Sequence, residues 1–259
     1  MKPLAGLRAQ GLRGLLFDID DTLTTEGRLT AAAYAALERL KASGFIAIPI
    51  TGRPAGWCDH IARMWPVDAV VGENGAFYFW HEGGKLKKRY LDAEDARASK
   101  RARLQAVAAT ILSQVPGTAL ASDQAYRETD LAVDFCEDVP ALPLSSAERV
   151  AALMRDAGLT AKISSIHVNG WFGNYDKLAT TKLLMRERFA IELDTANREF
   201  AFVGDSPNDA PMFAYFENAV GVANVSRFCG RLDAEPKYLT GAAAGAGFAE
   251  LVAHLLGAA

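Results

Sequence analysis

The sequence is poor in cysteine, with three residues, Cys58, Cys136 and Cys229, among 259. They lie far apart in the chain and show no metal-binding spacing. An odd number of cysteines also argues against a framework of disulfide bonds. We therefore expect reduced thiols, which are typical of a cytoplasmic protein.

The chain also lacks a strong excess of charge and any long apolar run. Its formal net charge is −3, so the overall balance predicts neither a nucleic-acid partner nor an anionic membrane surface. No segment is long and apolar enough to span a bilayer. Half of the 259 residues are hydrophobic, which is enough for one large domain or for a core domain with an insertion. We expect no nucleic acid and no membrane among its partners.

The most informative stretch lies near the N-terminus, where an apolar run ends abruptly in acidic residues. Residues 15–17 are apolar, and residues 18–22 are Asp-Ile-Asp-Asp-Thr. A short unbroken apolar run followed by turn-forming residues predicts a buried strand. Carboxylates clustered at its end repel one another unless a cation neutralises them, so the stretch predicts a divalent-metal site with a nucleophilic carboxylate. Taken alone, it is equally typical of a polar loop that caps the next helix.

Further apolar runs of strand length alternate with helical patterns. The runs lie at 45–50, 69–71, 200–203 and 219–222, with a short edge strand predicted at 237–240. Helical stripes separate them; Tyr34, Leu37 and Leu40, for example, follow the predicted N-cap Thr30. This alternation with short connections predicts an α/β fold with a doubly wound parallel sheet.

The segment 83–172 has a different character. A strongly charged helix is predicted at 93–115, and apolar and polar residues alternate at 131–135 and at 163–172. Ser145 and Glu148 predict a capping box for a second helix between these strands. Alternating strands are typical of an antiparallel sheet with one open face. We therefore expect an α+β cap domain at 83–172, inserted between two parts of a core at 1–82 and 173–259.

Four predicted core strands end in polar residues, which are Asp18 and Asp20, Thr51 and Arg53, Glu73 and Asn74, and Asp205 and Asp209. In a parallel sheet these ends lie at one edge. Unconnected helix caps would not explain all four ends together with a helix that opens on Lys177. The set contains what phosphoryl transfer requires, namely a carboxylate nucleophile, metal ligands, and a cation and a hydroxyl for phosphate oxygens.

With these clusters, the chain resembles the haloacid dehalogenase (HAD) superfamily of phosphatases. Residues 18–22 are similar to its first motif, 51–53 to the second, Lys177 to the third and 204–209 to the fourth, in that order. An insertion between the second and third motifs resembles a class II cap. Residues 73–76 and 222–224 are similar to the Cof-like, class IIB branch, which includes sucrose-phosphate, trehalose-phosphate and mannosylphosphoglycerate phosphatases.

The resemblance implies a role for each acidic residue. Asp18 would attack phosphorus and carry the aspartyl-phosphate. Asp20 would protonate the leaving alkoxide and then deprotonate the attacking water. Asp18 and Asp205, with the backbone carbonyl of Asp20, would hold Mg²⁺, and Asp209 would help directly or through water. Oxygen ligands of this kind suit Mg²⁺.

The resemblance also implies that Thr51, Gly52 and Lys177 bind phosphate oxygens. Lys182 is an alternative to Lys177, but Lys177 opens its helix as the family pattern does, and Lys182 is expected in solvent. Asp21 stands where this branch often has glycine, and we expect its side chain to point away from the site.

The function implied is Mg²⁺-dependent hydrolysis of a small phosphomonoester, such as a sugar phosphate. In the cap, Arg127, His167 and Asn169 are candidates for contacting this substrate, or they only solubilise an open sheet. Arg53 either belongs to the phosphate site or pairs with an acid. Two alternative functions remain: a hexose phosphomutase, which would have to shield its aspartyl-phosphate from water, and a non-catalytic binding protein on the same fold.

Overall fold

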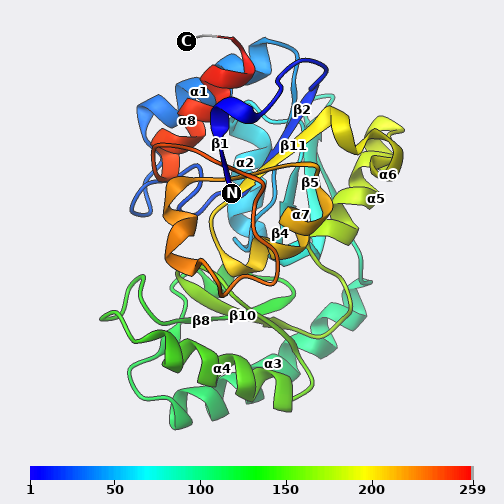
Figure 1. Ribbon diagram of the computed structural model, residues 1–259. Coiled ribbons are helices and arrows are strands. Elements are labelled where there is room, and N and C mark those ends of the chain that lie inside the picture. The colour runs from blue at the N-terminus through cyan, green and yellow to red at the C-terminus, as the bar shows by residue number, and fades with distance from the viewer. Residues whose placement is uncertain (258–259) are drawn as a thin grey trace.

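The computed structural model describes residues 1–257, and its centre is a parallel sheet (Figure 1). The strand order is β1 (Lys2–Pro3), β13 (Tyr238–Leu239), β12 (Asn218–Gly221), β11 (Phe200–Gly204), β2 (Gly14–Phe17) and β3 (Ile46–Pro49). Every pairing in this sheet is parallel. The predicted doubly wound α/β core is therefore confirmed, although β1 lies outside β13, so the strand predicted at 237–240 is not at the edge.

Helices cover both faces of this sheet (Figure 1). Helices α1 (Ala31–Ala42) and α8 (Ala244–Leu255) pack together on one face, where Leu15 and Phe17 of β2 are buried. Helices α5 (Lys177–Phe189), α6 (Leu193–Ala196) and α7 (Ala210–Tyr215) cover the opposite face, where Leu16 is buried. Because successive side chains of β2 point to opposite faces and both faces are covered, its sequence is continuously apolar.

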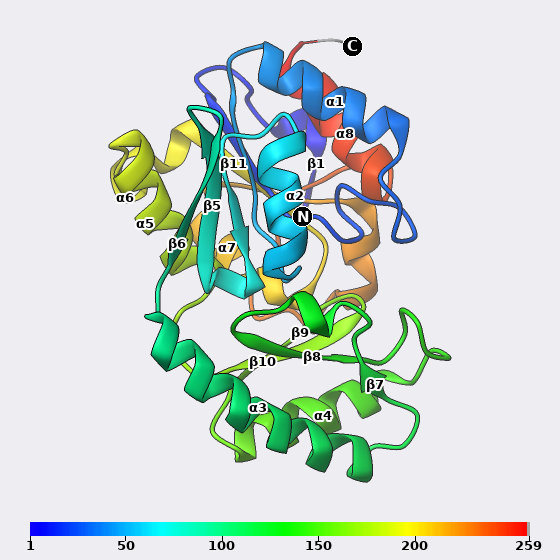
Figure 2. The ribbon, with the colours of Figure 1, turned by 180° about the vertical axis from the view of Figure 1, so that it is seen from behind.

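A three-stranded unit extends the core beyond β3. It contains β4 (Val70–Gly72) and the hairpin strands β5 (Phe77–Glu82) and β6 (Lys85–Tyr90), with α2 (Ala55–Met64) packed against it (Figure 2). A parallel bridge between Ile50 and Val71 joins it to the end of β3. Because β6 pairs with β5 along its whole length, we propose that the cap begins after Tyr90 rather than at residue 83.

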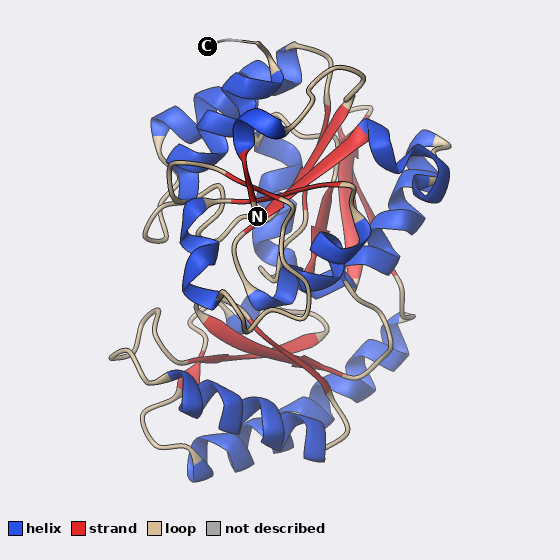
Figure 3. Cartoon of the chain, viewed as in Figure 1, coloured by secondary structure: helices blue, strands red, loops and turns tan. Residues whose placement is uncertain are grey.

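The inserted segment forms a second layered unit. Its sheet has the antiparallel order β7 (Ala119–Leu120), β8 (Asp130–Asp134), β10 (His167–Trp171) and β9 (Thr160–Ile163). Helices α3 (Glu94–Gln114) and α4 (Leu144–Asp156) pack on one face of the sheet with their apolar side chains. The other face is turned toward the core (Figure 3).

Three local expectations for this segment were wrong. All residues of β8 and β10 are buried, because the core covers the polar face that was expected to be open. The alternation at 163–172 is not one strand, since β9 ends at Ile163 and a turn at 164–166 leads into β10. Helix α4 begins at Leu144 after Pro143 and has no side-chain cap, so the predicted capping box is absent.

The start of α5 is held against the end of β4. The hydroxyl of Thr180 donates to the carbonyl oxygen of Gly75, with a separation of 2.5 Å. Gly75 has a φ of +108°, and a Cβ atom there would lie 2.2 Å from the carbonyl oxygen of Asp176. Only glycine permits both this backbone conformation and this approach. The contact places Lys177, the first residue of α5, at the edge where β4 ends.

No helix among the described residues 1–257 is long and apolar enough to cross a membrane.

Candidate active site

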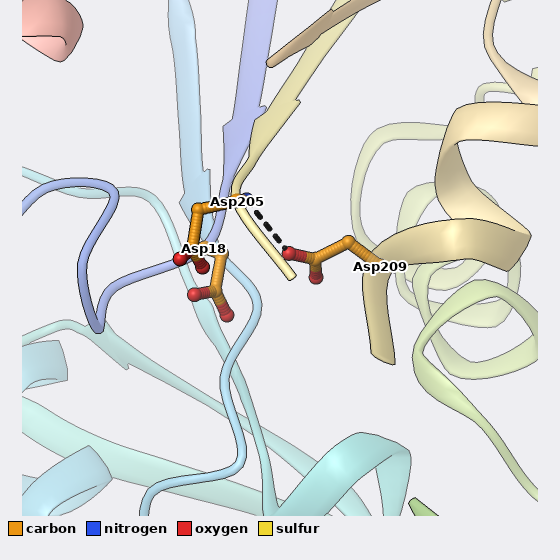
Figure 4. A group of neighbouring side chains, drawn as sticks. All are labelled: Asp18, Asp205 and Asp209. Carbon is orange, nitrogen blue, oxygen red and sulfur yellow. Dashed lines mark hydrogen bonds between the residues drawn. The ribbon is translucent and has the colours of Figure 1, made fainter. Parts of the chain in front are cut away.

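Three buried aspartates meet at the carboxyl edge of the core sheet (Figure 4). Asp18 follows β2 and Asp205 follows β11, and these two strands are neighbours. Asp209 ends the short helix η5 (Pro207–Asp209), and one of its carboxylate oxygens accepts the backbone N–H of Asp205 at 3.1 Å. One oxygen from each of the three carboxylates lies within 4.8 Å of the others.

Lys177 is the cation closest to this cluster. Its Nζ donates to Oδ1 of Asp18 and to Oδ1 of Asp209, at 2.7 Å in each case. Burial raises the pKa of Asp18 to about 8, against the lowering effect of Lys177 and with a further increase from Asp209 and Asp20. Burial also raises the pKa of Asp205 well above its ordinary value, and Asp18 and Asp209 raise it further. Lys177 therefore does not fully balance the negative charge.

The cluster has the features of a site for a hard divalent cation. All three groups offer carboxylate oxygens, the donors that Mg²⁺ prefers. Oδ1 of Asp205 is fully buried and has no hydrogen-bond partner in the part of the chain that the structure describes, although Asp205 Oδ2 accepts hydrogen bonds from Asn224 at 3.0 Å and Arg227 at 3.0 Å. A buried unpaired carboxylate oxygen is costly unless a positive charge faces it. The described residues therefore fit a divalent cation at this point.

Asp20 lies beside the cluster but its carboxylate is turned toward Arg53. Nε of Arg53 donates to both oxygens of Asp20, at 2.9 and 3.1 Å. The same guanidinium donates to Glu137 at 2.6 Å and to Asp123 at 3.3 Å, and both of these acids belong to the cap. Arg53, for which two roles were open, thus pairs with acids. It connects the core carboxylate Asp20 to the cap.

The segment after β3 brings Thr51 and Gly52 to the same edge. Thr51 is fully buried, and its hydroxyl accepts the backbone N–H of Arg53 at 3.0 Å. A Cβ atom at Gly52 would lie 3.2 Å from the side chain of Asn74, so there is little room for a side chain at this position. The carbonyl oxygen of Gly52 accepts a hydrogen bond from the cap residue Arg127 at 2.8 Å.

Glu73, at the end of β4, joins three segments. Its carboxylate accepts backbone N–H groups of Ala55, at the start of α2, and of Glu128 and Thr129 in the cap, at 2.9, 2.9 and 2.6 Å. The hydroxyl of Thr129 donates to it as well. Glu73 is therefore a tie between core and cap.

The cap residues predicted to face the substrate are placed differently from one another. His167 and Asn169 line a cavity of about 10 Å³ together with Asp18, Asp20 and the turn at 164–166. The amide of Asn169 donates to Asp130 at 2.9 Å. Arg127 does not line this cavity; its guanidinium is buried against Asp123 and Asp130 and bonds to Gly52.

The structure also places Asp21 and Lys182, the two core residues whose position relative to the site was uncertain from the sequence. Asp21 has a φ of +54°, in the left-handed region that favours glycine, and its carboxylate lies 3.3 Å from Arg227. Arg227 also contacts Asp205, so Asp21 is coupled to the cluster rather than pointing away from it. Lys182 pairs with the exposed Asp194 at 2.6 Å and packs over Tyr215, outside the cluster.

Sequence reasoning missed the parts of the cap that bind Arg53 or line the cavity beside Asp20. These are Glu137, Asp123 and the turn at 164–166. Glu137 lies in the polar loop just after the alternating run at 131–135, which was the one available signal. Arg227 also went unnoticed, although it follows closely on residues 222–224, and it carries no local pattern that marks it as a partner of Asp205.

The parallel sheet, the carboxylates at its edge and the inserted cap define a capped, doubly wound α/β enzyme. A family model described as haloacid dehalogenase-like hydrolase matches residues 12–216. The chain therefore belongs to the haloacid dehalogenase-like hydrolases, as its four motifs predicted. No curated protein matches the sequence itself.

Solved structures of sugar phosphatases share the fold. The C-terminal domain of trehalose-6-phosphate phosphatase from C. albicans has a TM-score of 0.69 at 14% identity, covering 96% of this chain and 94% of that one. Sucrose-phosphatase from Synechocystis sp. PCC6803 has a TM-score of 0.63 at 16% identity, covering 94% and 98%. A sugar phosphatase of HAD subclass IIB has a TM-score of 0.60 at 16% identity, covering 96% and 100%. These identities show a common fold.

Replacing Lys177 with methionine should destabilise the protein by about 3–5 kcal/mol, because buried carboxylates lose their paired cation. Lys182→Met is the matched control on the same helix and should cost less than about 1 kcal/mol, since its ion pair is exposed. Urea unfolding without added metal measures both. Equal effects of the two substitutions would contradict the assignment of Lys177 to the cluster.

Proposed function

We propose that the protein is a Mg²⁺-dependent phosphatase that hydrolyses a small phosphomonoester, such as a sugar phosphate. The observation that supports this most is the convergence of Asp18, Lys177, Asp205 and Asp209 at one buried point of the sheet edge. A carboxylate that is buried, adjacent to a cation and close to other metal-ligating groups has the surroundings that nucleophilic attack on a phosphate ester requires.

In the first step an oxygen of Asp18 forms a bond to phosphorus while the bond between phosphorus and the leaving oxygen breaks. Asp20 gives its proton to that oxygen, so the product leaves as an alcohol. Water then attacks the phosphorus of the aspartyl-phosphate, Asp20 takes a proton from this water, and Asp18 is restored as inorganic phosphate leaves. Lys177 and Thr51 hold phosphate oxygens, and Gly52 leaves room for them.

The residues that would hold Mg²⁺ are Asp18, Asp205, Asp209 and the backbone carbonyl of Asp20. The ion would offset the negative charge of carboxylates and phosphate, which allows the two to approach each other. Asn224 and Arg227 fix Asp205 through its second oxygen, so that the unpaired one remains available.

The cap has to move for substrate to enter. The cavity that Asp18 and Asp20 line measures about 10 Å³, roughly the room of one water molecule, and the cap turn at 164–166 lines its other side. We infer that the cap separates from the core to admit the phosphoryl group and then closes to exclude bulk water. His167 and Asn169 would then lie beside the reacting group, whereas Arg127 would fix the cap on Gly52.

The proposed activity is tested by released phosphate from a panel of phosphorylated metabolites with Mg²⁺. Asp18→Asn should lower turnover by about 10³-fold or more, since an amide is a poor nucleophile. Asp233→Asn, at an exposed position, is the control and should keep full turnover. If Asp18→Asn keeps its turnover and has a native circular-dichroism spectrum, Asp18 is not the nucleophile. Isomerised substrate without released phosphate would identify a mutase instead.

The effect of replacing Asp20 should depend on how much protonation the leaving group needs. Asp20→Asn should lower phosphoenzyme formation from an alkyl phosphate by about 10²–10⁴-fold, the usual contribution of general acid–base catalysis. With p-nitrophenyl phosphate the loss in the same step should be much smaller, because this leaving group needs little protonation. Single-turnover kinetics with both substrates measures the difference. Equal losses would show that Asp20 does not act as the general acid.

Mg²⁺ should stabilise the protein, because the ion binds only the folded arrangement of carboxylates. At a concentration 100 times its Kd, the midpoint of thermal unfolding should rise by about 5 °C or more. Asp205→Asn should abolish this rise, and Asp233→Asn should retain it. EDTA should remove activity in the wild type and Mg²⁺ should restore it. A rise that persists in Asp205→Asn would place the ion elsewhere.

A further inference from the structure

A second cavity adjoins Asp20 at the seam between core and cap. It measures about 380 Å³. Its charged lining residues are Asp20, Asp21, Glu26, Arg53, Glu137 and Arg227. If Asp20 protonates the leaving oxygen, as in the proposed function, the leaving group has to lie next to this carboxylate. The small cavity at Asp18 holds roughly one water, so the larger one is the space available for the rest of the substrate.

Each cation of this larger cavity is already paired with at least two carboxylates. Arg53 contacts Asp20 and Glu137, at 2.8 and 2.6 Å. Arg227 contacts Asp21 and Asp205, at 3.3 and 3.0 Å. Four of the six charged lining residues are acidic and two are basic, so among residues 1–257 the cavity offers no free positive charge to an anionic group.

Glu137 is built into the cap loop in a fixed position. The buried carboxylate of Asp134 accepts the backbone N–H groups of Cys136, Glu137 and Asp138, at 2.9, 2.8 and 2.8 Å. The side chain of Glu137 then reaches Arg53, and one of its oxygens lies 2.8 Å from Nε2 of His167. Three backbone bonds to one side chain hold this loop against the end of β8.

Glu137 also carries a negative charge at neutral pH. Although partial burial acts to raise it, hydrogen bonds and charges of His167 and Arg53 lower the pKa of this carboxyl to about 2. Its side chain remains 22% exposed and lines the larger cavity. A fixed carboxylate with accessible oxygens accepts hydrogen bonds from hydroxyl groups and repels a second anion.

We propose that this cavity is the leaving-group site and that Glu137 is its specificity-determining residue, selecting neutral, hydroxyl-rich leaving groups against those that carry a carboxylate or a second phosphate. The proposal rests on the proposed phosphatase function and narrows its substrate class to monophosphates of neutral polyols and sugars. Selection works largely by rejection, because an anion would face Glu137 and find Arg53 already neutralised.

Two pairs of compounds that match in size test this. Glucose 6-phosphate and 6-phosphogluconate differ by a carboxylate in the leaving group, and so do glycerol 3-phosphate and 3-phosphoglycerate. The wild type with Mg²⁺ should show at least about tenfold higher kcat/KM for the neutral member of each pair that it hydrolyses. Raising the salt concentration should lower the ratio of the two kcat/KM values, because screening weakens the repulsion between Glu137 and the carboxylate of the anionic member.

Glu137→Gln keeps the shape of the side chain and removes its charge. The substitution should lower the ratio of kcat/KM between the neutral and the anionic member about tenfold, mainly because kcat/KM for the anionic member rises. Asp138→Asn is the matched control, since Asp138 is the next residue in the loop, is exposed and undergoes the same change of charge. This control should leave the ratio as in the wild type.

The outcomes separate the two proposals. No turnover of p-nitrophenyl phosphate or of any panel member by the wild type rejects the phosphatase function, and the specificity proposal with it. Turnover of p-nitrophenyl phosphate without either neutral member, or a wild-type ratio near one, overturns only the specificity proposal. So does an equal loss for both members in Glu137→Gln, which would make Glu137 a structural residue. If Glu137→Gln does not fold, the kcat/KM ratio of the wild type and its dependence on salt still decide whether the specificity proposal holds.

Discussion

The bridge from Lys177 to Asp18 and Asp209 is the contact on which the site depends. Three buried carboxylates at one sheet edge repel one another, and a paired cation makes their burial tolerable. Lys177 reaches them because α5 starts against the end of β4, at a position where only glycine fits. The fold thus brings together, from the ends of β2 and β11 and from the start of α5, charges that would not stay close in an open chain.

The seam between core and cap repeats this arrangement with different partners. Arg53 and Arg127 are both buried, and each is surrounded by acids from the cap, while the core residue Glu73 accepts backbone N–H groups of the cap. In the cap opening proposed above, Arg53 would lose Asp123 and Glu137, and Arg127 would lose Gly52, so that the charges of the seam would be solvated by water. The pairs of Arg127 with Asp123 and Asp130 lie within the cap and would stay. Closure of the cap would then depend on the balance between ion pairing and hydration, and it would position Asp20 through Arg53 at the same time.

The core could be predicted from the sequence because its signals are local. Continuous apolar runs such as 15–17 end in acids, and a parallel sheet brings those ends together wherever the strands lie in the chain. The cap could not be predicted equally well. Its strands β8 and β10 alternate as if exposed, yet the core covers them, and no local pattern reports that contact. Glu137 and Arg53 meet for the same reason, since 84 residues separate them in sequence and their contact depends on how the two units dock.

The pairing of β2 with β11 has a consequence for how the chain is made. Leu16 lies opposite Phe202, and the segment between them contains the whole cap. During synthesis, β2, β3 and the cap emerge before β11 and the acids that follow it. The early strands therefore expose one long apolar edge until β11 arrives to cover it. Contacts of such large sequence separation slow folding, and the unpaired edge is open to aggregation until the central strand is in place.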